Sequence, residues 1–142
     1  MKKLLLILPL LFLSNCSGND RINNCNFLID VGVNHTVNLN LSSNFPLGTI
    51  TGVVLIQNQG LAGIYVINVG NDTYRAWDAA DPNHAQQSCS FLQLDGVDVT
   101  CGCEDENKYN LFTGQSYDGQ LPCGLKEYRV TPSGSNSFVI SN

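Results

Sequence analysis

The clearest structural signal in this chain is Phe91-Leu92-Gln93-Leu94-Asp95-Gly96-Val97-Asp98-Val99-Thr100. Apolar and polar residues alternate on both sides of its centre, and a period of two is typical of half-buried strands. Asp-Gly favours a two-residue turn with positive φ, which glycine adopts at no steric cost. The sequence therefore predicts a tight β-hairpin that turns at Asp95-Gly96.

Short strands are also predicted on either side of this hairpin. From Val33 to Leu41, apolar residues alternate with polar ones, and His35 is expected to be an ordinary strand residue there. Further strands are predicted at 49–57, 61–69, 73–77, 127–131 and 137–141, with turns or loops at 42–48, 58–60, 70–72 and 132–136. No segment has a sustained helical period, so we expect an antiparallel all-β domain.

The N-terminal residues have the pattern of a bacterial lipoprotein signal. After Met1-Lys2-Lys3, the apolar run from Leu4 to Leu13 is too short to span a bilayer and is typical of a signal-peptide core. Leu13-Ser14-Asn15-Cys16 resembles a lipobox, in which the signal is cut before a cysteine that then carries acyl chains. We expect a signal peptide at 1–15, lipidation of Cys16, a tether at 16–24 and one domain at 25–142. The alternative is an ordinary secretory signal.

Such an anchor would place the protein in the bacterial cell envelope, on the periplasmic face or at the cell surface. Removal of Lys2 and Lys3 with the signal takes away two positive charges and changes the formal net charge from −5 to −7. An acidic surface repels phosphate backbones, so nucleic acid is not expected as a partner. The expected partner is the membrane, through the lipid on Cys16.

Five cysteines follow the predicted lipidation site, and in an oxidising compartment they are first of all disulfide candidates. Cys89 can bridge to Cys101 or to Cys103, which share a face if the chain is extended, so spacing does not separate these two partners. Cys25 and Cys123 are a second candidate pair. An odd number of cysteines leaves one thiol over.

The order of motifs in the second half of the chain is distinctive. It runs Tyr74-Arg75-Ala76-Trp77, Asp81-Pro82-Asn83-His84, the hairpin, Cys101-Gly102-Cys103-Glu104, Tyr109-Asn110-Leu111-Phe112-Thr113-Gly114 and Leu125-Lys126-Glu127-Tyr128-Arg129-Val130. This order resembles the Rieske iron–sulfur fold, and more closely a group of Rieske-like lipoproteins of Bacteroidetes-type bacteria. The resemblance covers roughly Tyr65 to Ile140. It implies stacked small sheets with an inserted loop-hairpin-loop subdomain at about 78–124.

In the Rieske family, Cys-x-His in the first loop and Cys-x-x-His in the second hold a two-iron, two-sulfur cluster. Carried over to this sequence, Asp81 stands in place of a ligand cysteine and Asn83 in place of a ligand histidine. Cys101 matches the second cysteine, whereas Glu104 stands in place of the second histidine. The resemblance therefore implies a degenerate cluster site.

The resemblance also bears on the disulfides. In one branch of the family a disulfide ties the two loops together, and Cys89 and Cys103 lie in comparable places. The analogy favours Cys103 as the partner of Cys89 and leaves Cys101 as a buried, unpaired thiol. By chain-entropy estimates, a disulfide that closes a loop of this length raises the free energy of unfolding by about 3 kcal/mol.

Soft thiolate and imidazole ligands are mostly missing from the two loops, so we expect no cluster and no metal ion. The alternative is a two-iron, two-sulfur cluster with non-standard ligands, for which the candidates are Asp81, His84, Cys101 and Cys103. A third hypothesis is a calcium site built from the oxygen donors Asp81, Asn83, Glu104, Asp105 and Glu106.

The sequence contains no catalytic constellation. His35 and His84 are the only histidines, and there is no glycine-rich phosphate loop. We therefore expect a non-enzymatic protein with a structural or interaction role in the envelope. An electron-transfer protein with unusual cluster ligands is the alternative function.

Overall fold

The structure, a computed structural model, describes residues 25–117, 119 and 121–142. Its strands are β1 (Asn34–Asn38), β2 (Val53–Ile56), β3 (Ile64–Gly70), β4 (Thr73–Asp78), β5 (Leu92–Asp95), β6 (Asp98–Cys101), β7 (Lys108–Asn110), β8 (Glu127–Pro132) and β9 (Ser137–Ser141). The strand pairings within these residues are antiparallel, which confirms the predicted all-β class. The predicted signal peptide, Cys16 and tether lie outside the described residues.

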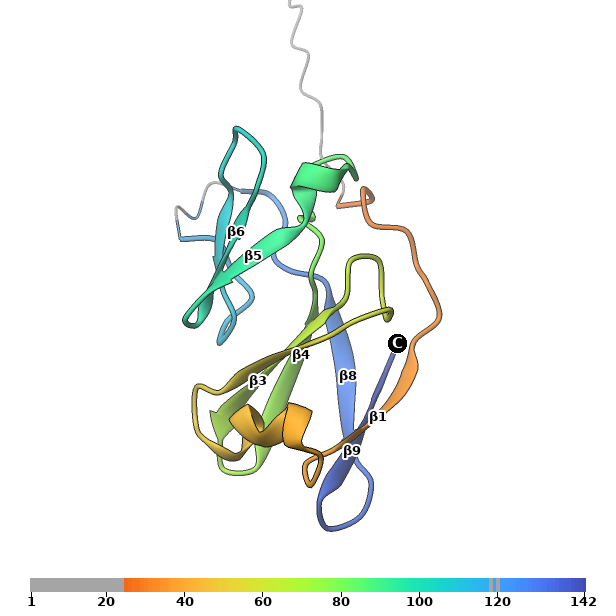
Figure 1. Cartoon of the computed structure of the whole chain (residues 1–142). Coiled ribbons are helices and arrows are strands. Elements are labelled where there is room, and N and C mark those ends of the chain that lie inside the picture. Colours follow the sequence, from red (N-terminus) through yellow and green to blue (C-terminus); the bar gives the residue numbers. More distant parts are fainter. Residues whose placement is uncertain (1–24, 118, 120) are drawn as a thin grey trace, which may run out of the picture.

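The described strands form two sheets. The larger has the order β1-β9-β8-β4-β3-β2, and the smaller has the order β5-β6-β7. Figure 1 shows the small sheet at one end of the molecule and η1 (Ser42–Gly48) at the other. The strands of the small sheet all fall between β4 and β8 in the sequence, inside the segment 78–124 where an inserted subdomain was predicted.

Strand β3, which lies between β4 and the edge strand β2, is buried on both faces and separates two hydrophobic clusters. Ile64 and Val66 point into a core closed by β1, β8, β9 and η1. Their neighbours Tyr65 and Ile67 point into a second core, which the small sheet covers. Successive side chains of a strand alternate between faces, so one apolar run serves both cores.

Several local predictions differ from the structure. Residues 42–48 were predicted as a loop but form the 3₁₀ helix η1, which contains Pro46 and buries Leu47 completely. The strand predicted at 49–57 begins only at Val53, because residues 49–52 turn to bring the Thr51 amide to the Asn68 carbonyl oxygen. Strand β7 was not predicted. At three residues, it is too short to show a periodic pattern.

The predicted hairpin is present as β5 and β6, but its turn lies one residue later than expected. Asp95 pairs with Asp98, so Gly96 and Val97 are the turn residues. Gly96 has a φ of 64°. Two-residue hairpin turns need a positive φ at the first central position. In the predicted turn this residue would be Asp95, whereas in the observed turn it is Gly96. The register therefore follows the glycine rather than the aspartate.

Hydrogen bonds tie the small sheet and the loop after it to the large sheet. Trp77 Nε1 donates to the Leu111 carbonyl oxygen at 2.7 Å, and the Tyr65 hydroxyl donates to the Leu92 carbonyl oxygen at 2.9 Å. Through Trp77 and Tyr65, the two sheets share one set of buried aromatic side chains.

The helices of the described residues are too short and too polar to cross a membrane.

Gly114 is required where this loop passes over Trp77. Its φ is 73°, and a Cβ atom built there would lie 2.4 Å from the Trp77 ring. We expect Gly114→Ala to lower the free energy of unfolding by about 2–3 kcal/mol, through left-handed strain and overpacking. Chemical denaturation monitored by tryptophan fluorescence measures this loss. Gly32→Ala is the matched control, because nothing lies within 4 Å of its Cβ position; an equal loss in both variants would contradict the prediction.

Candidate functional site

The first loop begins with a completely buried carboxylate. Asp81 follows the buried end of β4 and has a relative exposure of 0%. Its Oδ1 accepts hydrogen bonds from the Tyr109 hydroxyl at 2.5 Å and from the Asn83 backbone amide at 2.9 Å. Its Oδ2 accepts one from Asn107 Nδ2 at 2.9 Å. A buried charged group is tolerated when it is paired or fully hydrogen-bonded, and these three donors meet that need.

Asn83 connects the first loop to the segment before β8. Its Nδ2 donates to the Cys123 carbonyl oxygen at 2.7 Å and to the Tyr109 hydroxyl at 2.8 Å. Its Oδ1 accepts from the Cys123 backbone amide at 3.1 Å. The side chain thus bonds both backbone groups of Cys123, as a neighbouring strand would do. Asn83 has a structural role at the position where the resemblance placed a ligand.

Tyr109 lies at the centre of this network. Its hydroxyl donates to Asp81 and accepts from Asn83, and its side chain is fully buried. Burial, followed by the hydrogen bond to the Asp81 carboxylate, raises the pKa of Tyr109 above its usual range. Tyr109 and Asn107 were not predicted as site residues. The sequence held one signal for a buried polar network: Asp78 and Asp81 stand on either side of two small apolar residues, directly after a strand.

A second tyrosine–aspartate pair lies nearby. Asp78 is also fully buried, and it accepts hydrogen bonds from the Tyr128 hydroxyl at 2.7 Å and from the Leu61 and Ala80 amides at 2.8 and 2.9 Å. Burial raises the pKa of Tyr128 as well, with the Asp78 carboxyl adding to the effect. Sequence reasoning did not single out this pair, although it holds β4, β8 and the loop before β3 together.

Four of the five cysteines in the described residues form two disulfide bonds. Cys25 is bonded to Cys123 across a sequence separation of 98, and Cys89 is bonded to Cys103 across a separation of 14. The Cα atoms of the second pair lie 4.9 Å apart. The open choice between Cys101 and Cys103 is decided in favour of Cys103. Cys101 is the last residue of β6 and is buried, whereas Cys103 follows a bend at Gly102.

Cys101 is the free cysteine of the described residues, and it is buried. Its Sγ donates to the Cys89 carbonyl oxygen at 3.9 Å. Burial raises the pKa of the Cys101 thiol to about 12, from an ordinary value of 9.0, and the nearby Asp81 carboxyl adds to the rise. A thiol of this kind stays protonated at neutral pH and is a poor nucleophile.

The raised pKa gives a pH dependence of stability. Between pH 9.0 and about 12 the unfolded chain has lost the Cys101 proton and the folded chain has kept it. The unfolded state then binds fewer protons, so the free energy of unfolding falls as pH rises. We expect Cys101→Ala to reduce this slope. Urea unfolding of both proteins at several pH values above about 8 measures it, and identical slopes would contradict the prediction.

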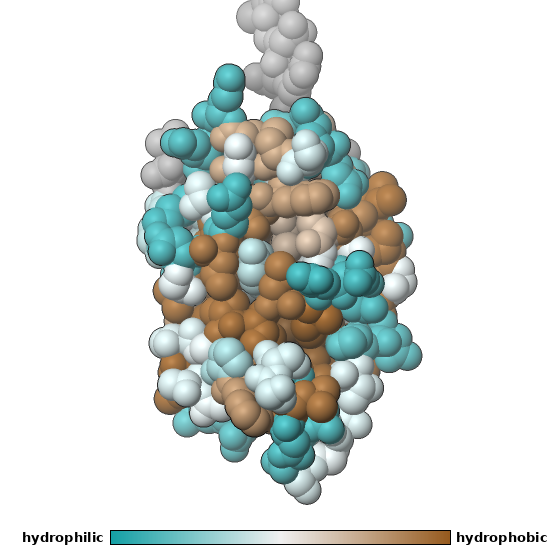
Figure 2. Space-filling view, viewed as in Figure 1, coloured by the Kyte–Doolittle hydropathy of each residue, from teal (hydrophilic) through white to brown (hydrophobic). Residues whose placement is uncertain are grey.

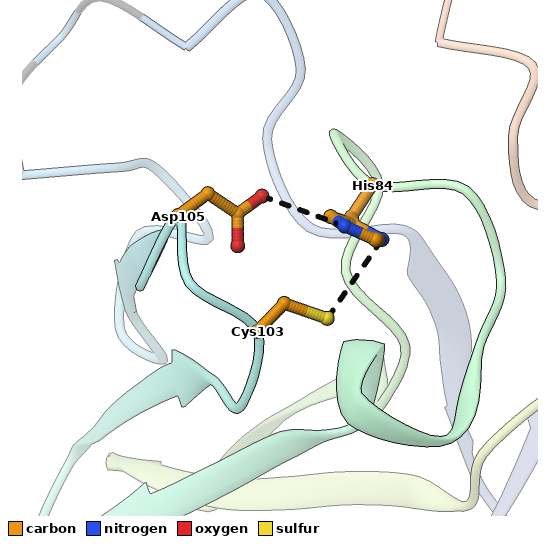
Figure 3. Close-up of side chains that lie close together, drawn as sticks. All are labelled: His84, Cys103 and Asp105. Atoms are coloured by element: carbon orange, nitrogen blue, oxygen red, sulfur yellow. Dashed lines mark hydrogen bonds and ion pairs between the residues drawn. The ribbon is translucent and has the colours of Figure 1, made fainter.

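A mixed group of donors lies at the outer side of the disulfide. One donor atom from each of His84, Cys103 and Asp105 lies within 4.8 Å of the other two. The Cys103 Sγ is 3.9 Å from His84 Nδ1, and His84 Nε2 is 4.0 Å from Asp105 Oδ2. Figure 3 shows the imidazole between the sulfur and the carboxylate. Asp81, Cys101 and Asp105 form a second such group.

The alternative ligand sets are only partly brought together. Of the proposed cluster ligands, Asp81 and Cys101 fall in one group and His84 and Cys103 in the other. For the calcium hypothesis, Asp105 joins both groups, whereas the exposed Glu104 and Glu106 join neither. His35 is half-buried in β1, as expected for a strand residue.

No protein-family model matches the sequence, and no curated protein matches it significantly. The Rieske resemblance therefore rests on the motifs in the sequence and stays a prediction.

Proposed function

We propose that this chain is a lipid-anchored protein of the bacterial cell envelope, with a degenerate Rieske-like domain that carries no cluster and has a structural or interaction role. The observation that carries the proposal is the hydrogen bonding of Asp81. Both carboxylate oxygens of Asp81 are occupied by donors from within the fold, at the position where a cluster would need a thiolate.

The donor set does not fit a two-iron, two-sulfur cluster. A Rieske centre needs two thiolates on one iron and two imidazoles on the other. Asn83 is bonded to the Cys123 backbone, and the sulfur of Cys103 is in a disulfide. Cys101 is left as the only thiol of the described residues, and His84, the one histidine in the two loops, falls in a different group of donors from Cys101. We therefore derive no electron-transfer step for this protein.

A structural or interaction role is supported by two further observations. The thiol of Cys101 is neutral at physiological pH, so it lacks the reactivity of a nucleophile. Large apolar side chains are exposed at Phe27, Ile29, Leu41, Phe45, Ile50, Leu55, Phe91, Leu94 and Tyr117. Figure 2 shows hydrophobic residues gathered across the middle of one face. Exposed apolar surface is a feature of proteins that contact partners or membranes.

The cluster-free proposal is tested by measuring iron, acid-labile sulfide and the visible spectrum of the protein purified anaerobically and in air. We expect colourless protein without stoichiometric iron. About two irons and two sulfides per chain, with charge-transfer bands, would establish the alternative electron-transfer function.

The anchor is tested separately by feeding a labelled fatty acid to the expressing bacterium. We expect the wild-type chain to incorporate label and Cys16→Ala to incorporate none. Equal labelling of both chains, or no label in either, would remove the anchor from the proposal.

A further inference from the structure

The disulfide between Cys89 and Cys103 lies beside two side chains that are common metal ligands. His84 comes from the first loop and Asp105 from the turn after β6, so the two loops supply donors from opposite sides. Their side chains are 22% and 36% exposed, and Cys103 is 9% exposed. An ion from solvent can therefore reach this group, in contrast to the buried Asp81 and Cys101.

The imidazole of His84 is already oriented as in a metal site. Its Nδ1 lies 2.7 Å from the Ala85 carbonyl oxygen, and a carbonyl oxygen can only accept, so Nδ1 carries the proton. In the neutral ring the lone pair is then on Nε2, the atom that faces Asp105. Ligating histidines usually donate their other N–H to a carbonyl or carboxylate, which fixes the tautomer.

The carboxylate of Asp105 is oriented in the same way. Its Oδ2 accepts a hydrogen bond from Asn107 Nδ2 at 3.1 Å, and the same amide group donates to Asp81. Asn107 thus ties the exposed carboxylate to the buried network. The backbone amide of His84 also donates to the Asp81 carbonyl oxygen, at 3.4 Å. Both prospective ligands are held by the rigid part of the domain.

We propose that reduction of the Cys89–Cys103 bond creates a binding site for a Zn²⁺-like divalent ion, with Cys89, Cys103, His84 and Asp105 as ligands. A thiol reductant supplies two electrons and two protons, which break the S–S bond and leave two thiols. Zinc binding then releases two protons from these thiols. With the bond intact, only His84 and Asp105 remain as ligands, which is too few to hold the ion.

The distances suit a tetrahedral zinc site. Zinc lies about 2.3 Å from thiolate sulfur and about 2.0 Å from imidazole nitrogen or carboxylate oxygen, which sets ligand separations of roughly 3.3–3.8 Å. The ligating nitrogen, His84 Nε2, lies 4.0 Å from Asp105 Oδ2, close to such a separation. Cys103 Sγ lies 3.9 Å from the other ring nitrogen, Nδ1, so the His84 side chain has to turn on binding for Nε2 to meet the sulfur as well. The two sulfurs move to van der Waals separation when their bond breaks, which is the spacing that two zinc thiolates have. Mixed sulfur, nitrogen and oxygen donors favour zinc over calcium or magnesium.

The test uses the full chain purified in detergent, in oxidised form and after reduction by dithiothreitol, which is then removed anaerobically. Titration with Zn²⁺ against a chromophoric chelator should give one tightly bound ion per reduced chain and none per oxidised chain. We expect His84→Ala and Asp105→Asn each to weaken zinc binding at least about tenfold. The matched controls His35→Ala and Glu104→Gln should bind as wild type does.

Alkylation mapping identifies the thiols that hold the ion. Zinc should protect Cys89 and Cys103 from iodoacetamide in the reduced chain and leave Cys25 and Cys123 reactive. Cys101→Ala should retain the zinc affinity. The proposal is overturned if the oxidised chain binds equally well, if the reduced chain binds no zinc, or if protection falls on the other pair. Iron and sulfide analysis of the same preparation distinguishes failure of this proposal from failure of the cluster-free proposal, because a cluster on His84 and Cys103 would be detected as iron and sulfide before any zinc is added.

Discussion

Removing the carboxylate of Asp81 should cost roughly 3–5 kcal/mol of the free energy of unfolding. Asp81→Ala deletes three hydrogen bonds to a charged group, and each such bond contributes about 1.5–3 kcal/mol. It also leaves the buried Tyr109 hydroxyl without its acceptor. The total stays below the simple sum because Asn107 keeps a partner in Asp105. A loss of this size is a large fraction of the stability of a small domain.

Equilibrium denaturation in urea measures this loss. Asp81→Asn serves as the conservative comparison, since an amide oxygen can still accept one or two of the bonds and should lose less. Asp95→Ala removes an exposed carboxylate from β5 and is expected to be nearly neutral. If Asp81→Ala and Asp95→Ala unfold at similar urea concentrations, Asp81 does not hold the two loops together.

The bond between Cys25 and Cys123 should be the second large contributor. It closes a loop of nearly the whole described chain, and the chain-entropy estimate for such a span is about 4.7 kcal/mol, against about 3 for Cys89 and Cys103. The double variant Cys25→Ala/Cys123→Ala should therefore lose roughly 4–5 kcal/mol. Without the bond, the first described segment keeps the ion pair between Lys126 and the exposed Asp30, which contributes little.

Thermal and urea unfolding of the double variant under oxidising conditions test this ranking. The variant Cys89→Ala/Cys103→Ala is the matched control, because it removes a bond of the same chemistry that closes a shorter loop. The ranking fails if the short-loop variant is the less stable of the two.

Much of the fold could be predicted because its signals are local. The hairpin of β5 and β6 has alternating side chains around a glycine turn, and β8 and β9 flank a short turn segment at 133–136 that follows Pro132. Such patterns depend only on residues that are close in sequence. The segment 42–48 was assigned wrongly because Pro46 and several polar residues are compatible with either a loop or a short 3₁₀ turn.

The interior of the candidate site could not be predicted from the same signals. Asp81 was predicted as a degenerate cluster position or an alternative metal ligand, yet it is fully buried and accepts hydrogen bonds from residues that are 26 and 28 positions away in the sequence. Pairing of Cys89 with Cys103 depends on a bend at Gly102 that alternation does not reveal. Both features depend on tertiary contacts, which override local propensity.

The position of β3 between the two hydrophobic cores has a consequence for folding cooperativity. Ile64 and Val66 stabilise one core while Tyr65 and Ile67 stabilise the other, so neither core survives the detachment of this strand. Partial unfolding that releases one sheet and keeps the other is therefore disfavoured. The backbone amides of β3 should exchange with solvent only through global opening, at rates that report the stability of the whole domain.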